Sequence, residues 1–214
     1  MSMLTESGLV RLMDCGSSFS YILSDNSCFL TTEYKVLQSQ SGSGFVRCMK
    51  MMFNGAIQLC YLPGGLKTFQ SVLPALSPNK FLKIALNLLT NVLSVKSNGF
   101  LRCQNLDISW DKVFIDQNSL AVAMVYLPLS KKNFADFSEF ESQLKAELVR
   151  LIQNNENIQS NKTAQLAEFL QNGSISLEKL CTLIGGRGDD PGTGGTELGN
   201  NGGSEGIVLL TALN

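Results

Sequence analysis

Three aspartates, Asp107, Asp111 and Asp116, place carboxylates close together in one short stretch of the chain. Carboxylates at this spacing can hold a divalent cation or exchange a proton with a substrate. The chain contains no histidine, which excludes imidazole as a base, a proton shuttle or a metal ligand. Asp111 and Asp116 also stand beside predicted turns, where aspartate is common because its side chain bonds the local backbone. Turn chemistry and a carboxylate cluster therefore both remain open.

Six cysteines occur without a C-x-x-C pair, and several lie in apolar runs such as 57-IQLCYL-62. This spacing disfavours a cysteine-ligated metal and favours buried, reduced thiols. Because reduced cysteines are typical of the cytosol, we expect a cytoplasmic protein.

The composition predicts a folded protein with a weakly charged surface. Apolar residues make up 44% of the 214 residues and charged residues only 16%, against a usual charged share of about 25%. The net charge of -1 provides no general attraction to nucleic acid. No apolar run reaches the roughly 20 residues that span a bilayer, so we expect no membrane insertion.

Short apolar runs separated by polar turns predict a strand-rich region over residues 1–65. The expected strands are Gly8–Met13, Phe19–Leu23, Cys28–Leu30, Tyr34–Gln38, Phe45–Phe53 and Ala56–Leu62. Asn54-Gly55 separates the last two, and this dipeptide favours a type I′ hairpin because both residues tolerate positive φ.

Apolar residues at helical spacing predict a mainly helical region over residues 66–184. The expected elements are a helix over Leu66–Leu76, a long helix from Ser77-Pro78 to Asn98-Gly99, a β-hairpin within 113–127, a helix after the Asp136-x-x-Glu139 capping box, and helices over Thr163–Gln171 and Ser176–Ile184. Residues 185–214 are predicted to be a Gly-rich linker and tail, because ten of the 22 residues from Gly185 to Gly206 are glycine.

Two motifs in the predicted linker are weak. The run 185-GGRGDD-190 matches one calcium-binding repeat and contains RGD, but a single copy of either carries little information. The run 192-GTGGTELG-199 lacks the strand and lysine of a phosphate-binding loop. The apolar run 207-IVLLTAL-213 is too short to fold alone, so we expect the chain to lead to a further module.

The stretch 105-NLDISWDKVFID-116 resembles the catalytic loop of protein kinases, which reads H-R-D-L-K-x-x-N followed by apolar residues and Asp. In this register Asn105 takes the place of the histidine and Asp107 that of the catalytic aspartate. Lys112 falls where the family has its metal-binding asparagine. The run 122-VAMVYLP-128 is similar to the strand before D-F-G, which puts Tyr126 at the position of the metal-binding aspartate.

The resemblance implies a kinase architecture without phosphoryl transfer. Kinases bind two magnesium ions through the residues that Lys112 and Tyr126 replace, and catalysis depends on those ions. No G-x-G-x-x-G or V-A-I-K motif precedes the loop, and Lys35 and Lys50 are the only lysines of the strand region. We therefore expect no catalytic residue, no cofactor and no metal site. We expect Asp107 to bond its own loop, and Lys112 to point to solvent, with an anion contact as the alternative.

The segment 86–116 resembles an uncharacterised Gram-positive bacterial domain found before forkhead-associated phosphothreonine-binding modules. More distantly, the chain is similar to type VII secretion components of the EssB/YukC kind. These resemblances imply an α+β, two-lobed, degenerate kinase-like fold. The implied lobes are a β-rich N-lobe over 1–65 and a helical C-lobe over 66–184, followed by the tail over 185–214.

The function implied by these resemblances is a non-catalytic interaction or scaffold domain in bacterial phosphoprotein signalling. Its partner would be a protein, with a phosphoprotein recruited through an adjoining forkhead-associated module. One alternative is the cytosolic pseudokinase domain of a type VII secretion component. The other is a nucleotide-binding enzyme with atypical phosphoryl transfer, in which Asp107 still orients a nucleophile.

Overall fold

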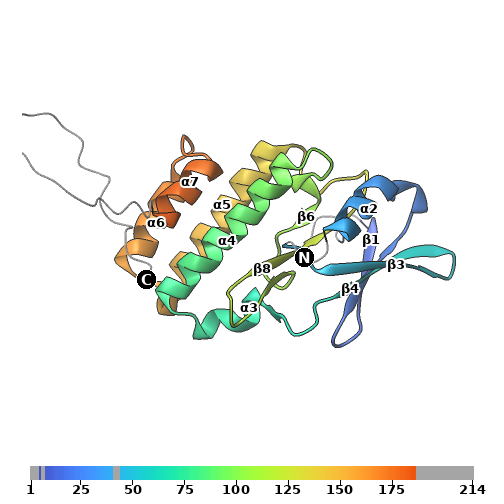
Figure 1. Ribbon diagram of the computed structural model, residues 1–214, viewed down its shortest axis with the longest axis horizontal. Coiled ribbons are helices and arrows are strands. Elements are labelled where there is room, and N and C mark those ends of the chain that lie inside the picture. Colours follow the sequence, from blue (N-terminus) through green and yellow to red (C-terminus); the bar gives the residue numbers. More distant parts are fainter. Residues whose placement is uncertain (1–4, 6–7, 41–43, 187–214) are drawn as a thin grey trace, which may run out of the picture.

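A four-stranded antiparallel sheet forms one end of the molecule (Figure 1). The computed structural model describes residue 5 and residues 8–40 and 44–186. The strands are β1 (Val10–Asp14), β2 (Phe19–Leu23), β3 (Arg47–Phe53) and β4 (Ala56–Leu62), and they lie in the order β1-β2-β4-β3. The predicted bounds of β2 and β4 are confirmed to the residue.

The turn between β3 and β4 is the two-residue hairpin that its sequence predicts. Asn54 has a φ of 48° and Gly55 a φ of 79°, so both central residues lie in the left-handed region. Phe53 and Ala56 then pair across the turn. The turn residues Asn54 and Gly55 therefore fix the register of the whole β3–β4 pair.

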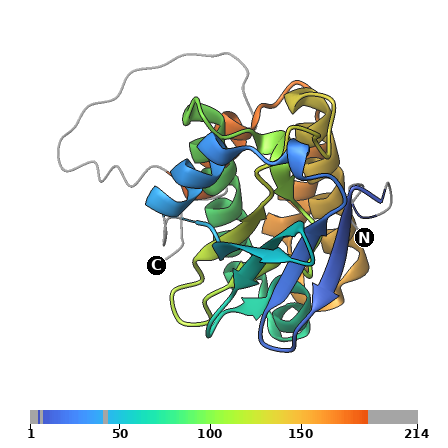
Figure 2. The ribbon, with the colours of Figure 1, turned by 90° about the vertical axis from the view of Figure 1, so that its right-hand side faces the viewer.

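Two of the predicted strands are wrong. Residues Tyr34–Gln38 belong to helix α2 (Thr31–Ser39), whose apolar side chains recur at helical rather than alternating spacing. The predicted strand Cys28–Leu30 is replaced by the 3-10 turn η1 (Asn26–Cys28), and only Phe29 makes a bridge, to Leu129. Figure 2, which faces this end of the molecule, shows α2 lying beside the sheet.

A second, smaller sheet lies between the first sheet and the main helices (Figure 1). Its strands are β5 (Lys67–Thr68), β6 (Leu106–Asp107), β7 (Val113–Ile115) and β8 (Val122–Tyr126), in the order β5-β7-β8-β6. The β7–β8 hairpin is predicted correctly. Its turn is held by Asp116, whose Oδ1 accepts hydrogen bonds from the Asn118 and Ser119 amides, each at 2.9 Å.

Helices form the rest of the molecule, and the two longest, α4 (Pro78–Ser97) and α5 (Phe137–Asn154), run side by side in Figure 1. The shorter ones are α3 (Phe69–Val72), α6 (Asn161–Gln171) and α7 (Leu177–Gly185), with 3-10 turns η2 (Leu73–Ala75), η3 (Cys103–Asn105) and η4 (Glu156–Ile158). Helix α4 is central, because it contacts β8, α6 and α7. It begins as predicted, with Ser77 capping the amide of Lys80 and Pro78 in the first turn.

Two local predictions for this region need correction. The helix expected over Leu66–Leu76 is interrupted, because Lys67 and Thr68 pair with β7 and only then does α3 begin. The capping box of α5 is only half formed: Asp136 accepts from the amide of Glu139, but Glu139 accepts from the amide of Ala135.

Backbone hydrogen bonds join the first sheet and α2 to the second sheet. The Leu30 amide donates to the Pro128 carbonyl oxygen at 2.8 Å, just before α2. The Val46 amide, just before β3, donates to the Met124 carbonyl oxygen of β8 at 3.0 Å. The two parts of the molecule are therefore bonded together on both sides of α2.

Within the described residues, no helix combines the length and hydrophobicity needed to cross a lipid bilayer. Residues 187–214, which contain nearly all of the predicted linker and the run 207–213, lie outside the described residues. The domain boundaries after 65 and 184 stay predictions.

The first testable prediction concerns the β3–β4 turn. Gly55→Ala should lower the free energy of unfolding by about 1–2 kcal/mol, because an L side chain is strained at this positive φ. Gly173→Ala is the matched control, since its φ is not positive and a Cβ there also meets open space. Urea unfolding of both variants measures the difference, and equal stabilities would contradict the role given to the turn.

Candidate functional site

A buried carboxylate lies where α2 meets the second sheet. Glu33, in the first turn of α2, is only 4% exposed. Its Oε2 accepts a hydrogen bond from the Tyr126 hydroxyl at 2.8 Å and another from Asn105 Nδ2 at 3.0 Å. Its Oε1 lies 3.4 Å from Nε of Arg102. Three side chains from two other segments of the chain thus surround the Glu33 carboxylate. Without them, burial of this charge would be strongly unfavourable.

Tyr126 is at the end of β8, and every polar atom described for it has a partner. Its hydroxyl donates to Glu33 and accepts from the Arg102 amide at 3.0 Å. Its carbonyl oxygen accepts from the Tyr61 hydroxyl at 2.7 Å. Burial and the nearby charge of Glu33 raise the pKa of the Tyr126 hydroxyl. The phenol is therefore a neutral hydrogen-bond donor at neutral pH.

Asp107 lies in β6 and is 2% exposed. Its Oδ1 accepts from the Ser109 amide at 3.0 Å, which is the loop bond that the sequence predicts. Its Oδ2 accepts from the hydroxyl of Tyr21, on β2, at 2.9 Å. Burial, followed by the charge of Asp107, raises the pKa of the Tyr21 hydroxyl. Both oxygens of Asp107 are thus occupied by groups of the protein itself.

Aromatic rings fill the space between the two sheets. The Phe19 ring, on β2, stacks on Tyr61 at 5.2 Å and on Phe114 of β7 at 5.9 Å between ring centroids. Tyr21 meets Tyr61 edge to face at 5.8 Å. All four rings are buried. The first sheet therefore packs directly against the second through side chains.

Lys112 does not point to solvent as predicted. Its side chain is only 12% exposed, and its Nζ lies 5.1 Å from the centroid of the Phe19 ring. The same amine forms an ion pair with Asp111. Contact with an aromatic face and with a carboxylate explains why this cation stays near the sheet interface.

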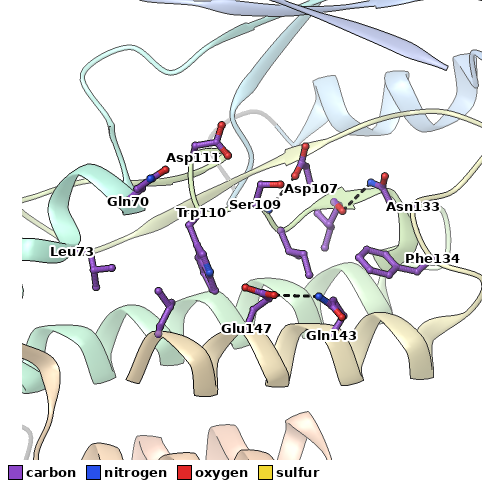
Figure 3. Close-up of a pocket in the computed structure, with 13 residues that line it drawn as sticks. Gln70, Leu73, Asp107, Ser109, Trp110, Asp111, Asn133, Phe134, Gln143 and Glu147 are labelled. Atoms are coloured by element: carbon purple, nitrogen blue, oxygen red, sulfur yellow. Dashed lines mark hydrogen bonds between the residues drawn. The ribbon is translucent and has the colours of Figure 1, made fainter. Parts of the chain in front are cut away.

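A pocket of about 530 Å³ lies on the other side of the Asp107 loop, between that loop and α5 (Figure 3). Trp110 points from the loop toward α5, while Gln143 and Glu147 point from α5 toward the loop. Gln143 Nε2 donates to Glu147 Oε1 at 3.2 Å. Phe134 forms one wall, and Asp107 and Asp111 belong to the loop side, with their carboxylates pointing away from α5 (Figure 3).

The structure brings some of the predicted site residues together and separates others. Asp107, Lys112 and Tyr126 all lie on the second sheet or its loops, and Asp111 pairs with Lys112. Asp116 lies in the β7–β8 turn, where bonds from the Ser119 and Asn118 amides lower the pKa of its carboxyl. It therefore serves the turn and does not extend a carboxylate cluster. That Asp107, Lys112 and Tyr126 occupy the kinase positions stays a prediction.

Sequence reasoning missed Glu33 and the tyrosines that contact the site. Glu33 was hidden by the wrong strand over Tyr34–Gln38, although the spacing of Leu30, Tyr34 and Leu37 is helical and could have revealed α2. Tyr21 and Tyr61 were placed correctly on strands, but nothing local indicates that their hydroxyls reach Asp107 and β8.

The second prediction concerns the bond between Tyr21 and Asp107. Asp107→Ala should lower the free energy of unfolding by about 1–2 kcal/mol, because two donors lose a charged acceptor. Tyr21→Phe should destabilise as well, and the double variant should lose less than the sum, since both changes remove one shared bond. Asp111→Ala, at an exposed carboxylate, should change stability by less than about 0.5 kcal/mol. Additive losses in chemical unfolding would contradict this coupling.

The third prediction concerns alkaline pH. The pKa values of the Tyr21, Tyr61 and Tyr126 hydroxyls are raised above 10.0 in the fold, mainly by burial. The unfolded chain therefore loses these protons first, and the free energy of unfolding should fall as pH rises above about 10. The buried thiols of Cys48 and Cys103, whose pKa burial raises to about 12, act in the same direction.

Urea unfolding between about pH 8 and about pH 11 measures this loss. Tyr126→Phe should show a shallower loss than the unchanged protein, because it removes one of the titrating phenols. A free energy of unfolding that stays constant across this range would contradict the burial of the three hydroxyls.

No family model matches the chain, and no curated protein matches it. Solved structures do match. The cytoplasmic fragment of EssB from Geobacillus thermodenitrificans has a TM-score of 0.57 at 10% identity, over 85% of this chain and 88% of that chain.

Two kinase structures are also similar. One is a divergent kinase lacking the glycine-rich loop, which regulates membrane ultrastructure of the Toxoplasma parasitophorous vacuole: TM-score 0.52, 8% identity, 77% of this chain and 66% of that one. The other is Rad53 in complex with AMP-PNP: TM-score 0.50, 12% identity, 81% of this chain and 64% of that one. Together with the antiparallel sheets and the helical part described above, these similarities show that the chain has a kinase-like α+β fold.

Proposed function

We propose that this chain is a non-catalytic kinase-like domain that acts by binding a protein partner. The observation that carries the proposal is the set of donors that the chain itself supplies to the Glu33 carboxylate. Tyr126 and Asn105 satisfy the buried carboxylate with neutral donors, and Arg102 adds a charge at the edge. A site arranged in this way satisfies its own charge without a metal ion.

Phosphoryl transfer in kinases depends on magnesium ions, held by an aspartate and an asparagine, and on an ion pair between a strand lysine and a helix glutamate. In the proposed register, Tyr126 and Lys112 take the two metal-binding positions. A buried phenol with a raised pKa and a paired ammonium group are both poor ligands for a hard dication. Among the described residues that contact Glu33, the only basic one is Arg102.

The aromatic contact between the sheets further supports a non-catalytic role. A nucleotide that entered this interface would displace Phe19 and Tyr61 from their stacks and break the bond from Tyr21 to Asp107. Each buried ring contributes to stability both through its area and through ring contacts of about 0.5–1.5 kcal/mol. Nucleotide binding would have to offset these losses.

The edge strand β3 supports binding of a protein partner. Met49, Met51, Met52 and Phe53 are all exposed there, and Met52 is 61% exposed. Exposed apolar side chains gathered on one strand are typical of interaction surfaces, and methionine adapts readily to a partner's shape.

Two biological contexts fit a binding domain. The first is phosphoprotein signalling, with a forkhead-associated module adjoining this domain, as the sequence resemblance implies. The second is a secretion component, and the likeness to the EssB cytoplasmic fragment over most of both chains supports this context. The rival enzyme function, in which Asp107 orients a nucleophile, is the one that a nucleotide titration addresses.

The fourth prediction tests the non-catalytic role. ATP at millimolar concentration, with or without magnesium, should leave the melting temperature unchanged, because Tyr126 and Lys112, at the proposed metal-binding positions, are a neutral phenol and a paired ammonium group. The same titration on Asp107→Ala provides the control for a specific site.

A rise in melting temperature that requires magnesium and disappears in Asp107→Ala would defeat the proposal and support the enzyme. A rise that is independent of magnesium and survives in Asp107→Ala would place nucleotide binding elsewhere on the surface and leave the proposal intact.

A further inference from the structure

The pocket between the Asp107 loop and α5 has an acidic lining. Asp107, Asp111 and Glu147 are among the described residues that line it, no lysine or arginine is among them, and of the three acids Glu147 is the one whose side chain points from α5 toward the loop (Figure 3). Asp107 has both oxygens occupied, so it acts only through its charge. Asp111 is exposed, and only its Oδ2 is paired. Lys112 and Arg150 offset the charges of Asp111 and Glu147, so the three acids and these two cations leave one net negative charge around the pocket.

Two acceptor atoms of residues that line the pocket have no donor within the described part of the chain. Glu147 takes both of its hydrogen bonds, from Gln143 and Arg150, on Oε1, which leaves Oε2 free. Asn133, which is 5% exposed, donates through Nδ2 to the Leu106 carbonyl oxygen, and its Oδ1 is without a partner. A ligand that brings hydrogen-bond donors would satisfy the open oxygen of Glu147.

Aromatic walls accompany these carboxylates. Trp110 extends toward α5 next to Glu147, and Phe134 closes the far side (Figure 3). An indole face attracts cations, and more strongly when the cation is partly desolvated. Carboxylates beside aromatic faces bind organic cations, because the apolar part of the ligand contacts the rings while its charge meets the acids.

In the structure, the Glu147 carboxylate of the pocket is paired with a cation of the chain itself, Arg150. Arg150, one turn along α5 from Glu147, reaches back to Glu147 Oε1. The Arg150 side chain is 62% exposed and the Glu147 side chain 24% exposed. Pairs this exposed contribute little, about 0–1 kcal/mol, so an incoming cation can replace Arg150 at small cost.

We propose that this pocket binds an organic cation, a guanidinium or alkylammonium group, between Trp110 and Glu147. The group could come from a basic side chain of a protein partner or from a free polyamine, and the test separates the two. The proposal goes beyond the binding role stated above and does not depend on it, since it requires neither a nucleotide site nor its loss.

The chain contains a single tryptophan, so Trp110 reports directly on the pocket. The fifth prediction is that the peptide acetyl-Ala-Arg-Ala-amide, or spermidine, changes Trp110 fluorescence in a saturable manner and shifts the indole N–H resonance. The same peptide with citrulline in place of arginine keeps the shape without the charge and should bind at least about tenfold more weakly, because a charged hydrogen bond is lost. A response to the peptide alone indicates a protein source, and a response to spermidine alone indicates a polyamine.

Two variants on α5 should change the affinity in opposite directions. Glu147→Gln removes the charge at constant shape and should weaken binding of the responding cation by about tenfold. Arg150→Gln removes the competing cation and should strengthen binding severalfold. Glu168→Gln, which removes an exposed carboxylate from α6 outside this pocket, is the matched control and should leave the affinity unchanged.

Circular dichroism of each variant checks that the fold is retained. Equal binding of the arginine and citrulline peptides, or equal weakening by Glu147→Gln and Glu168→Gln, would overturn the proposal. So would the absence of both a fluorescence and a resonance change with every cation. None of these results would affect the nucleotide titration, so the failure of the cation site is distinguishable from the failure of the non-catalytic role.

Discussion

The buried carboxylate of Glu33 constrains how the two parts of this fold meet. A charge removed from water is costly unless donors surround it, and here the donors come from Arg102, Asn105 and Tyr126. These residues lie far from Glu33 in sequence: Arg102 directly precedes η3, Asn105 ends η3, and Tyr126 ends β8. Helix α2 can therefore take only the position in which Glu33 reaches all of them. The aromatic contact between the sheets is a second set of contacts that joins the same two parts of the molecule.

The same arrangement gives a physical account of the proposed non-catalytic role. An aspartate in place of Tyr126 would put a second carboxylate near Glu33, and two like charges at close range favour a bound proton or a nearby cation. A tyrosine at this position supplies a neutral donor instead and adds no second charge. In the proposed register, a tyrosine at position 126 both removes a metal-binding aspartate and gives Glu33 a hydrogen-bond donor. The aromatic stack of Phe19, Tyr61 and Phe114 fills the space between the two sheets.

Local signals in the sequence predicted the elements that local physics controls. Asn54-Gly55 and Ser77-Pro78 specify a turn and a helix start through their own backbone preferences, and both are where they were expected. Helix α2 was missed because its N-cap residue, Leu30, makes no side-chain cap and because its apolar face is short. Glutamate is usually exposed, so the burial of Glu33 follows only from its tertiary contacts. Lys112 was misplaced for the same reason, since its partner Phe19 comes from a distant strand.

The backbone bonds that flank α2 tie the first sheet to a much later part of the chain. Leu30 and Val46 donate to carbonyl oxygens of Pro128 and Met124. During synthesis on the ribosome, the amino-terminal strands emerge well before these acceptors do. Contacts between such distant residues slow folding, because a long loop must close before they form. The amino-terminal sheet therefore docks on the second sheet only after the β7–β8 hairpin has left the exit tunnel, and until then its aromatic face stays exposed.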